Sequence, residues 1–155
     1  MRIRRATPDD VDAIFDVRTS VHENHMTEED LADIGVTRAS TRQAIMDNSL
    51  PIWCAFVDDQ LVGFSSIKIE DKELFALFVR PECEGKGAGS ALHDIAVNWW
   101  FRNYPNEPLN LNTNQSARSF AFYQKREWVV VEGEPKPHME EGDVFMQLNV
   151  RQAIK

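Results

Sequence analysis

The chain has 155 residues, a length that suits one domain spanning residues 1–155 with a substantial hydrophobic core. Apolar residues make up 43% and charged residues 27%, a balance that excludes a disordered, collagen-like or membrane-spanning chain. With 17 basic and 25 acidic residues the formal net charge is -8, so the chain repels phosphate backbones and we expect no nucleic-acid partner.

The amino-terminal residues and the cysteines indicate a compartment. The basic start leads straight into Pro8 and Asp9 without an apolar segment, so we expect no signal peptide and no membrane association. The two cysteines, Cys54 and Cys83, lack the CxxC spacing of zinc sites, and neither has a nearby histidine arrangement that would activate it. We therefore expect a cytoplasmic protein with no metal.

The first half of the chain is predicted to alternate between helices and strands. A short strand over residues 3–6 precedes a helix entry at residues 7–10, where Thr7 can act as the cap. Val11, Ile14, Phe15 and Arg18 follow with helical spacing. Helices are predicted to begin at residues 27 and 37, and strands over residues 52–57, 61–69 and 74–79.

The second half continues this alternation. Residues 88–102 form a predicted helix with Leu92, Ile95, Ala96 and Trp99 on one face, which places His93 at the surface. Strands over residues 109–112, 128–131 and 144–148 surround a helix at 116–126. Because the middle strands are joined by hairpins, the fold class is α/β with a mixed sheet.

The most informative segment is rich in glycine and lies between a strand and a helix. Gly85, Gly87 and Gly89 fall within five residues, at the predicted start of the helix. Free backbone N–H groups and the helix dipole at such a position favour a phosphate ligand, and the alternative is a turn needed only for backbone geometry. The G-x-G-x-G spacing matches neither the dinucleotide fingerprint nor the P-loop, which disfavours NAD and ATP.

A second motif follows as N-x-x-A-x-x-x-x-F-Y-x-K-x-x-W, from Asn114 to Trp128. Together with V-x-P-x-x-E-G-x-G-A-G-x-x-L, from Val79 to Leu92, it resembles the GCN5-related N-acetyltransferase family. The resemblance spans nearly the whole chain. Two positions depart from the family pattern: Glu84 replaces Arg or Gln, and Glu127 replaces the Gly before the last aromatic residue.

The resemblance implies a splayed mixed β-sheet flanked by helices, with acetyl-CoA between the fourth and fifth strands. Phe78 and Val79 would then pair with pantetheine through their backbone, and Asn114 would bind the cofactor's amide arm. The pyrophosphate would lie on the backbone amides of Gly85, Lys86, Gly87, Ala88, Gly89 and Ser90. Tyr123 would stand near the thioester sulfur as general acid, and its alternative role is half of an aromatic core pair.

The general base and the acceptor residues follow less directly from the motifs. Glu73, at the start of the strand that feeds the glycine-rich segment, is the first choice of base, and its alternative is a solvated strand end. His22 and His25 are other candidates through their imidazole rings. Acceptor contacts are expected in the loop between the first helices, at His22, Glu23 and Asn24.

The function expected from these features is direct acetyl transfer from acetyl-CoA to a primary amine of a small, cationic or polar acceptor. A non-catalytic acyl-CoA-binding or regulatory module is the alternative. Because dimers are common in the family, a homodimer is a candidate assembly. Glu84 is expected to disfavour the pyrophosphate unless it points outward or pairs with Lys86 or Arg80.

Overall fold

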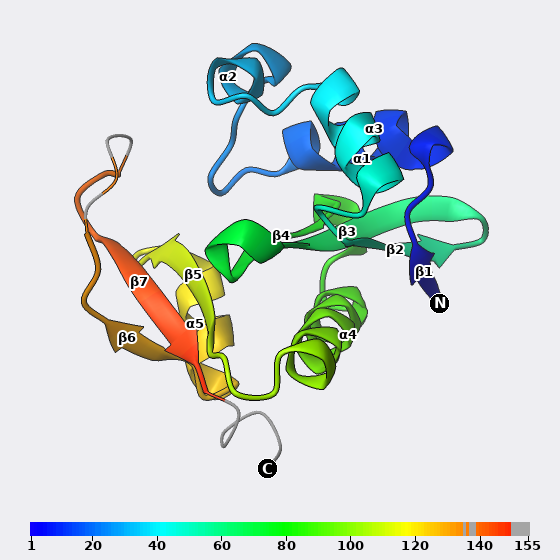
Figure 1. Ribbon diagram of the computed structural model, residues 1–155. Coiled ribbons are helices and arrows are strands. Elements are labelled where there is room, and N and C mark those ends of the chain that lie inside the picture. Colours follow the sequence, from blue (N-terminus) through cyan, green and yellow to red (C-terminus); the bar gives the residue numbers. More distant parts are fainter. Residues whose placement is uncertain (135, 137–138, 150–155) are drawn as a thin grey trace.

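The computed structural model describes residues 1–134, 136 and 139–149. It contains one seven-stranded sheet in the order β1-β2-β3-β4-β5-β7-β6, with helices on both faces (Figure 1). The strands are β1 (Arg2–Arg5), β2 (Ile52–Val57), β3 (Gln60–Lys68), β4 (Glu73–Val79), β5 (Leu109–Asn114), β6 (Val129–Val131) and β7 (Asp143–Leu148). The α-helices are α1 (Val11–Ser20), α2 (Glu28–Asp33), α3 (Arg38–Asp47), α4 (Ala88–Asn103) and α5 (Arg118–Lys125).

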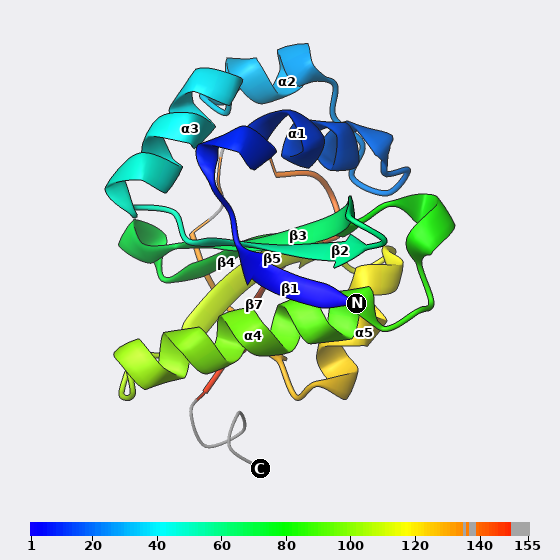
Figure 2. The ribbon, with the colours of Figure 1, turned by 90° about the vertical axis from the view of Figure 1, so that its right-hand side faces the viewer.

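The helices divide between the two faces of the sheet. Helices α1, α2 and α3 lie on one face and α4 lies on the other, as the turned view shows most clearly (Figure 2). Ile14 and Val17 of α1 pack with Cys54 and Phe64 on the first face. The larger cluster lies under α4 and includes Trp100, Leu109, Trp128 and other buried side chains. The predicted α/β class and mixed, splayed sheet are confirmed.

The sheet consists of two antiparallel parts joined by one parallel contact. Strands β1 to β4 pair antiparallel in sequence order, and β5, β7 and β6 form a second antiparallel part. Between these parts, the parallel register of β4 with β5 holds a single pair, Glu73 with Asn110. The two strands separate toward their carboxyl ends, where Figure 1 shows them diverging.

Local signals in the sequence explain several element boundaries. Thr27 caps α2 through a bond from the Asp30 N–H, and the Asp30 carboxylate accepts the Thr27 N–H in return. The turn between β2 and β3 places Asp58 and Asp59 at positive φ, as a tight hairpin turn requires. Glu127 also has positive φ, at +70°, in the position where the family pattern has glycine.

The buried face of α4 is rotated from the one that the spacing predicted. His93 is 4% exposed, so its expected surface position is wrong. Leu92, Ala96, Val97 and Trp100 are buried with it, whereas Trp99 and Ile95 are half-buried. His93 is compatible with the interior because both ring nitrogens have partners there. No helix in the described part of the chain is long and apolar enough to span a membrane.

Candidate functional site

One edge of β4 faces the gap between the two parts of the sheet. β3 covers the other edge of β4 along its length, but β5 pairs with β4 only at Glu73. Phe75 is an extra residue between the pairs that Leu74 and Ala76 make with β3, so the strand carries a bulge there. Alternate backbone groups from Leu74 to Val79 therefore lack a strand partner among the described residues. Such an edge can take an extended ligand as an additional strand.

The glycine-rich segment follows directly from the end of β4. A short 3-10 turn, Pro81–Cys83, leads into Gly85 and Gly87, which have positive φ of 77° and 90°. Gly87 is the N-cap of α4, and no side chain in the described part of the chain caps this helix end. The N–H groups of the first turn, which includes Ala88, Gly89 and Ser90, therefore remain for a ligand. This geometry suits an anion such as a pyrophosphate.

Glu84 is paired, but with neither of the two expected residues. Its carboxylate lies 3.1 Å from Nη2 of Arg118, at the start of α5. Nε of Arg118 also lies 3.2 Å from Oε1 of Glu23, and the Glu23 carboxylate accepts a hydrogen bond from the backbone N–H of Arg118. Arg80 instead donates through Nε to the carbonyl of Leu61. The Arg118 ion pairs thus join the glycine-rich segment, α5 and the loop between α1 and α2.

A second arginine contacts the start of α4. Arg126 donates to Oγ of Ser90, and its guanidinium lies 3.6 Å from the centre of the Phe122 ring. Two of the basic residues near the predicted phosphate position, Arg118 and Arg126, thus already have partners within the chain. Lys86 is exposed on the glycine-rich segment itself.

Tyr123 lies in a buried aromatic cluster on the inner side of α5. Its ring centre is 5.3 Å from that of Phe122, 5.6 Å from that of Trp128 and 6.3 Å from that of His93. Burial raises the pKa of the Tyr123 hydroxyl, while the positive charge of Arg126 acts in the opposite direction. The hydroxyl therefore stays protonated at neutral pH, as a proton donor must. Both roles considered for Tyr123, packing and acid, are compatible with this position.

Glu73 lies at the narrow end of the gap between β4 and β5. Its Oε2 accepts from Asn112 of β5 at 3.4 Å, and its Oε1 lies 3.8 Å from Nζ of Lys136. The side chain is only 12% exposed, so Glu73 is not a solvated strand end. The next residue, Leu74, packs in the cluster under α4, so Glu73 points to the opposite face, which α1 to α3 cover.

Asn114 is occupied by contacts within the chain. Its Nδ2 donates to the carbonyl of Glu141 and to Oδ1 of Asp143, and its Oδ1 accepts from the N–H and hydroxyl of Ser116. These contacts tie the end of β5 to the start of β7 and form the turn that leads to α5. The structure thus gives the Asn114 side chain a turn-forming role, and a cofactor contact would have to compete with it.

The loop between α1 and α2 holds the predicted acceptor residues His22, Glu23 and Asn24, all of which are exposed. Glu23 reaches across to α5 as described above, and Asn24 has φ of 54°. The carbonyl of Asn24 accepts a bond of 3.2 Å from Nη1 of Arg18. His25 contacts the Val21 carbonyl through Nδ1.

Arg18 is a residue near the site to which the sequence analysis gave no function. It is 9% exposed, and its guanidinium lies 4.3 Å from the centre of the Phe78 ring. The signal that could have identified it is its position on the apolar stripe of α1, because an arginine on such a stripe needs an explanation.

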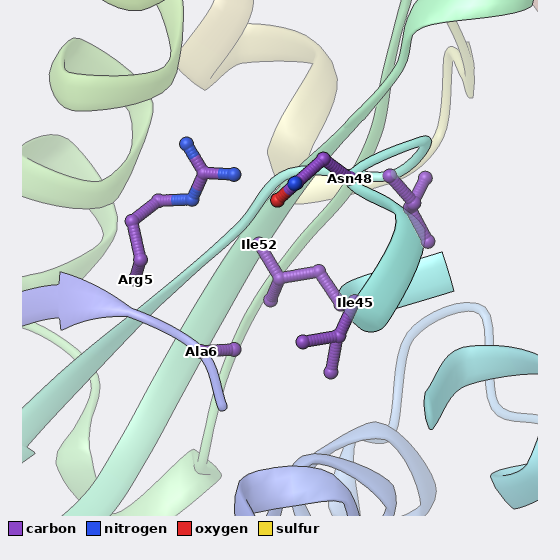
Figure 3. A pocket seen from close by; sticks show the side chains of 6 residues that line it. Arg5, Ala6, Ile45, Asn48 and Ile52 are labelled. Atoms are coloured by element: carbon purple, nitrogen blue, oxygen red, sulfur yellow. The ribbon is translucent and has the colours of Figure 1, made fainter. Parts of the chain in front are cut away.

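Two cavities lie elsewhere. A cavity of about 280 Å³ is lined by Arg5, Ala6, Ile45, Asn48, Leu50 and Ile52, at the β1–β2 side of the sheet (Figure 3). Another, of about 500 Å³, is lined by the end of β6, the β6–β7 connection and β7, including Glu132, Glu140 and Phe145. No group of three or more potential metal ligands occurs within the part of the chain that the structure describes.

Comparisons with known proteins point to one family. The family model described as "Acetyltransferase (GNAT) domain" matches residues 22–146. No curated protein matches the sequence. Among solved structures, PaiA N-acetyltransferase from Thermoplasma acidophilum in complex with coenzyme A is similar with a TM-score of 0.77 and 20% identity, over 96% of this chain and 98% of that chain.

Two further solved structures are named for different acceptors. Ribosomal-protein-alanine N-acetyltransferase from Brucella melitensis has a TM-score of 0.73 and 18% identity, over 96% of this chain and 99% of that chain. Spermidine/spermine N-acetyltransferase SpeG from Vibrio cholerae has a TM-score of 0.70 and 14% identity, over 99% and 96%. At these identities the likeness concerns the fold.

Proposed function

Because the chain belongs to the GNAT family of acetyltransferases, we propose that it transfers an acetyl group from acetyl-CoA directly to a primary amine of a small acceptor. The observation that carries this proposal is the unpaired edge of β4, which ends at a glycine-rich segment and an uncapped helix start. An extended amide chain with a pyrophosphate at one end is the ligand that matches both features.

The cofactor would lie along the gap between β4 and β5. The amide groups of pantetheine would pair with the backbone of Phe78 and Val79, and the pyrophosphate would accept bonds from the amides of residues 85–90. The exposed Lys86 would add a positive charge there. Asn114 would contact the amide arm only if it gave up one of its bonds at the β5–β7 turn.

The chemistry requires one bond to form and one to break. The amine nitrogen attacks the thioester carbon, the new C–N bond forms, and the C–S bond breaks to release CoA. An unpaired backbone N–H near the Phe75 bulge would polarise the thioester carbonyl. The carboxylate of Glu73 would take the proton from the amine, and the Tyr123 hydroxyl would donate to the departing thiolate. This direct route needs no covalent enzyme intermediate.

Charge supports a small acceptor that carries an ammonium group over a purely acidic one. Carboxylates occur on the loop between α1 and α2, on α2 and around the β6–β7 connection, namely Glu23, Glu28, Glu29, Asp30, Asp33, Glu132, Glu134, Glu140, Glu141 and Asp143. A negative field of this kind attracts an ammonium group. The chain's net charge of -8 likewise favours an acceptor with an ammonium group, and it disfavours nucleic acid as a partner. The cytoplasm, where acetyl-CoA is available, is the compartment that we propose.

The test is thiol release from acetyl-CoA in the presence of a panel of amines, with the wild-type chain and the Glu73→Gln variant. We expect release that depends on the amine, and a fall of roughly 10²–10⁴ in kcat for Glu73→Gln with retained acetyl-CoA binding. Binding of acetyl-CoA without turnover of any amine would favour the non-catalytic acyl-CoA-binding module. Absence of binding would contradict both.

A further inference from the structure

Arg18 is a buried cation that no carboxylate of the described residues neutralises. Its side chain lies between α1 and the face of β4, is 9% exposed, and stacks on Phe78 at 4.3 Å. Among the described residues no carboxylate forms an ion pair with it, and its one hydrogen bond goes to the carbonyl of Asn24. Burial lowers the pKa of the Arg18 guanidinium, and no neighbouring charge compensates. A charge in such a position destabilises the folded chain unless an anion binds to it.

The guanidinium keeps donors that a ligand can reach. A guanidinium has five N–H groups, and among the described residues only Nη1 of Arg18 has a hydrogen-bond partner. Every fully buried side-chain nitrogen or oxygen of the described residues has a partner. Nε and Nη2 of Arg18 must therefore retain contact with solvent. Nε and Nη2 lie on the same edge of the guanidinium, and such an edge can bind a carboxylate through two parallel hydrogen bonds.

The face of the sheet on which Arg18 lies indicates whether the cofactor or the acceptor could provide that anion. Arg18 and the Phe78 ring lie on the face covered by α1, whereas the glycine-rich segment leads into α4 on the opposite face. Glu73, the proposed base, points to the same face as Arg18. An anion that reaches Arg18 from this side therefore belongs to the molecule that meets the base, which is the acceptor rather than the pyrophosphate.

We propose that Arg18 binds a carboxylate of the acceptor, so that the acceptor is an amine that also carries a carboxylate. This inference rests on the proposed function and narrows its substrate class. Phe78 lies three residues beyond the bulge at Phe75, which is roughly 10 Å along a strand. The amine and the carboxylate should therefore be separated by several bonds, as in an ω-amino acid or the side chain of a free lysine.

The test compares matched acceptors that differ only in the carboxylate. ω-Amino acids of increasing length are assayed beside the alkylamines of equal length, with the wild-type, Arg18→Met and Arg18→Lys chains. We expect the wild type to favour the amino acids in kcat/KM, and Arg18→Met to reduce that preference roughly 10- to 100-fold, the value of a charge-assisted contact. Arg18→Lys keeps the charge but loses the paired donors, and we expect an intermediate preference. Arg42→Met, an exposed change on α3, is the control and should leave the preference unchanged.

Binding measurements separate this inference from its alternatives. Calorimetry of the same matched pairs in the presence of CoA should show tighter binding of the amino acid to the wild type than to Arg18→Met, with the CoA dissociation constant unchanged. A weaker CoA complex in Arg18→Met would assign Arg18 to the cofactor and overturn the inference. An equal loss for amino acids and alkylamines would mean that Arg18 only positions the loop at Asn24. If the wild type acetylates alkylamines but does not prefer the amino acids, the proposed function stands and this inference fails.

Discussion

Nε1 of Trp128 donates a hydrogen bond of 3.0 Å to Nε2 of His93, in the core between α4 and the start of β6. Because indole nitrogen only donates, Nε2 of His93 must be the acceptor and Nδ1 carries the proton, which it shares with Asp94 at 2.9 Å. Both ring nitrogens are thereby used, and the imidazole is neutral. His93 is a structural residue next to Tyr123, not a base.

This pair predicts that the chain loses stability in mild acid. Burial lowers the pKa of His93 in the folded chain below its ordinary value of about 6.5, so the unfolded chain binds the proton first as the pH falls. The contribution of neutral His93 to the free energy of unfolding should be fully present above about pH 7. It should decrease as the pH falls through the pKa of histidine in the unfolded chain. Urea titrations from pH 5 to 8 measure it. In His93→Gln, the amide oxygen can still accept the bond from Trp128, and this dependence on pH should be lost. If the free energy of unfolding of this variant changes with pH as in the wild type, His93 is not its cause.

Gly89 offers a test of the phosphate site that does not disturb the fold. A Cβ built there would meet only Cγ2 of Val79, at 3.9 Å, an ordinary contact, and its φ is not in the left-handed region. Gly89→Ala should keep or raise stability, since alanine favours helices by about 0.5–1 kcal/mol. The larger Gly89→Val should weaken acetyl-CoA binding about tenfold or more by blocking the approach of the phosphates to the amides. Calorimetry on the folded variants that finds wild-type affinity would exclude the glycine-rich segment as the pyrophosphate site.

The Arg118 ion pairs predict opposite effects of two substitutions on the cofactor. Arg118→Met leaves the carboxylates of Glu84 and Glu23 without their cation beside the proposed pyrophosphate position, so acetyl-CoA should bind more weakly. Glu84→Arg removes one of these carboxylates and should tighten binding. Both effects should shrink as salt is added, because the groups are exposed. If Glu84→Arg instead weakens the complex at low salt, Glu84 has a specific contact with the ligand.

Tyr123→Phe removes the hydroxyl and keeps the ring, so it tests the role of the hydroxyl alone. The ring contacts with Trp128 and Phe122 survive, so folding and acetyl-CoA affinity should be retained. If the hydroxyl protonates the leaving thiolate, kcat should fall by roughly 10²–10⁴. Tyr104→Phe is the matched control, because the half-buried Tyr104 stacks on Trp100 and has no proposed role in transfer. An unaffected kcat in Tyr123→Phe would leave Tyr123 with the packing role alone.

Glu127 has a left-handed backbone that glycine adopts without strain. Its φ of 70° follows α5 directly, before Trp128 enters the core. Glu127→Gly should raise the free energy of unfolding by about 1 kcal/mol, with no change in kcat. Chemical denaturation tests this, and a loss of stability would show that the contacts of the Glu127 side chain outweigh the strain.

The order of elements could be predicted because the sequence marks them locally. The cap at Thr27, the turn at Asp58 and Asp59 and the apolar runs of the middle strands are each determined within a few residues. The fold class, and the position of the glycine-rich segment between a strand and a helix, were predicted correctly for the same reason. The position of His93 was not predicted, because its burial depends on a partner 35 residues away, Trp128.

The candidate site was predicted only in part, since several of its contacts join distant segments. The hydrogen bond from Arg118 to Glu23 joins residues 95 positions apart, so no local sequence pattern could predict it. Asn114 matches the family pattern in type, but its amide is used by Asp143, Glu141 and Ser116. That Arg18 is buried against Phe78 without a carboxylate partner among the described residues likewise becomes visible only when α1 lies on β4.

The unpaired edge of β4 offers main-chain amides, which every residue type except proline supplies. A ligand held there is recognised through the spacing of peptide groups and not through side-chain identity. Substitutions along Leu74–Val79 that keep the strand extended and its inner face packed would leave the recognition intact. A fold that binds in this way can diverge far in sequence, and the solved structures described above share its shape at identities of 14–20%.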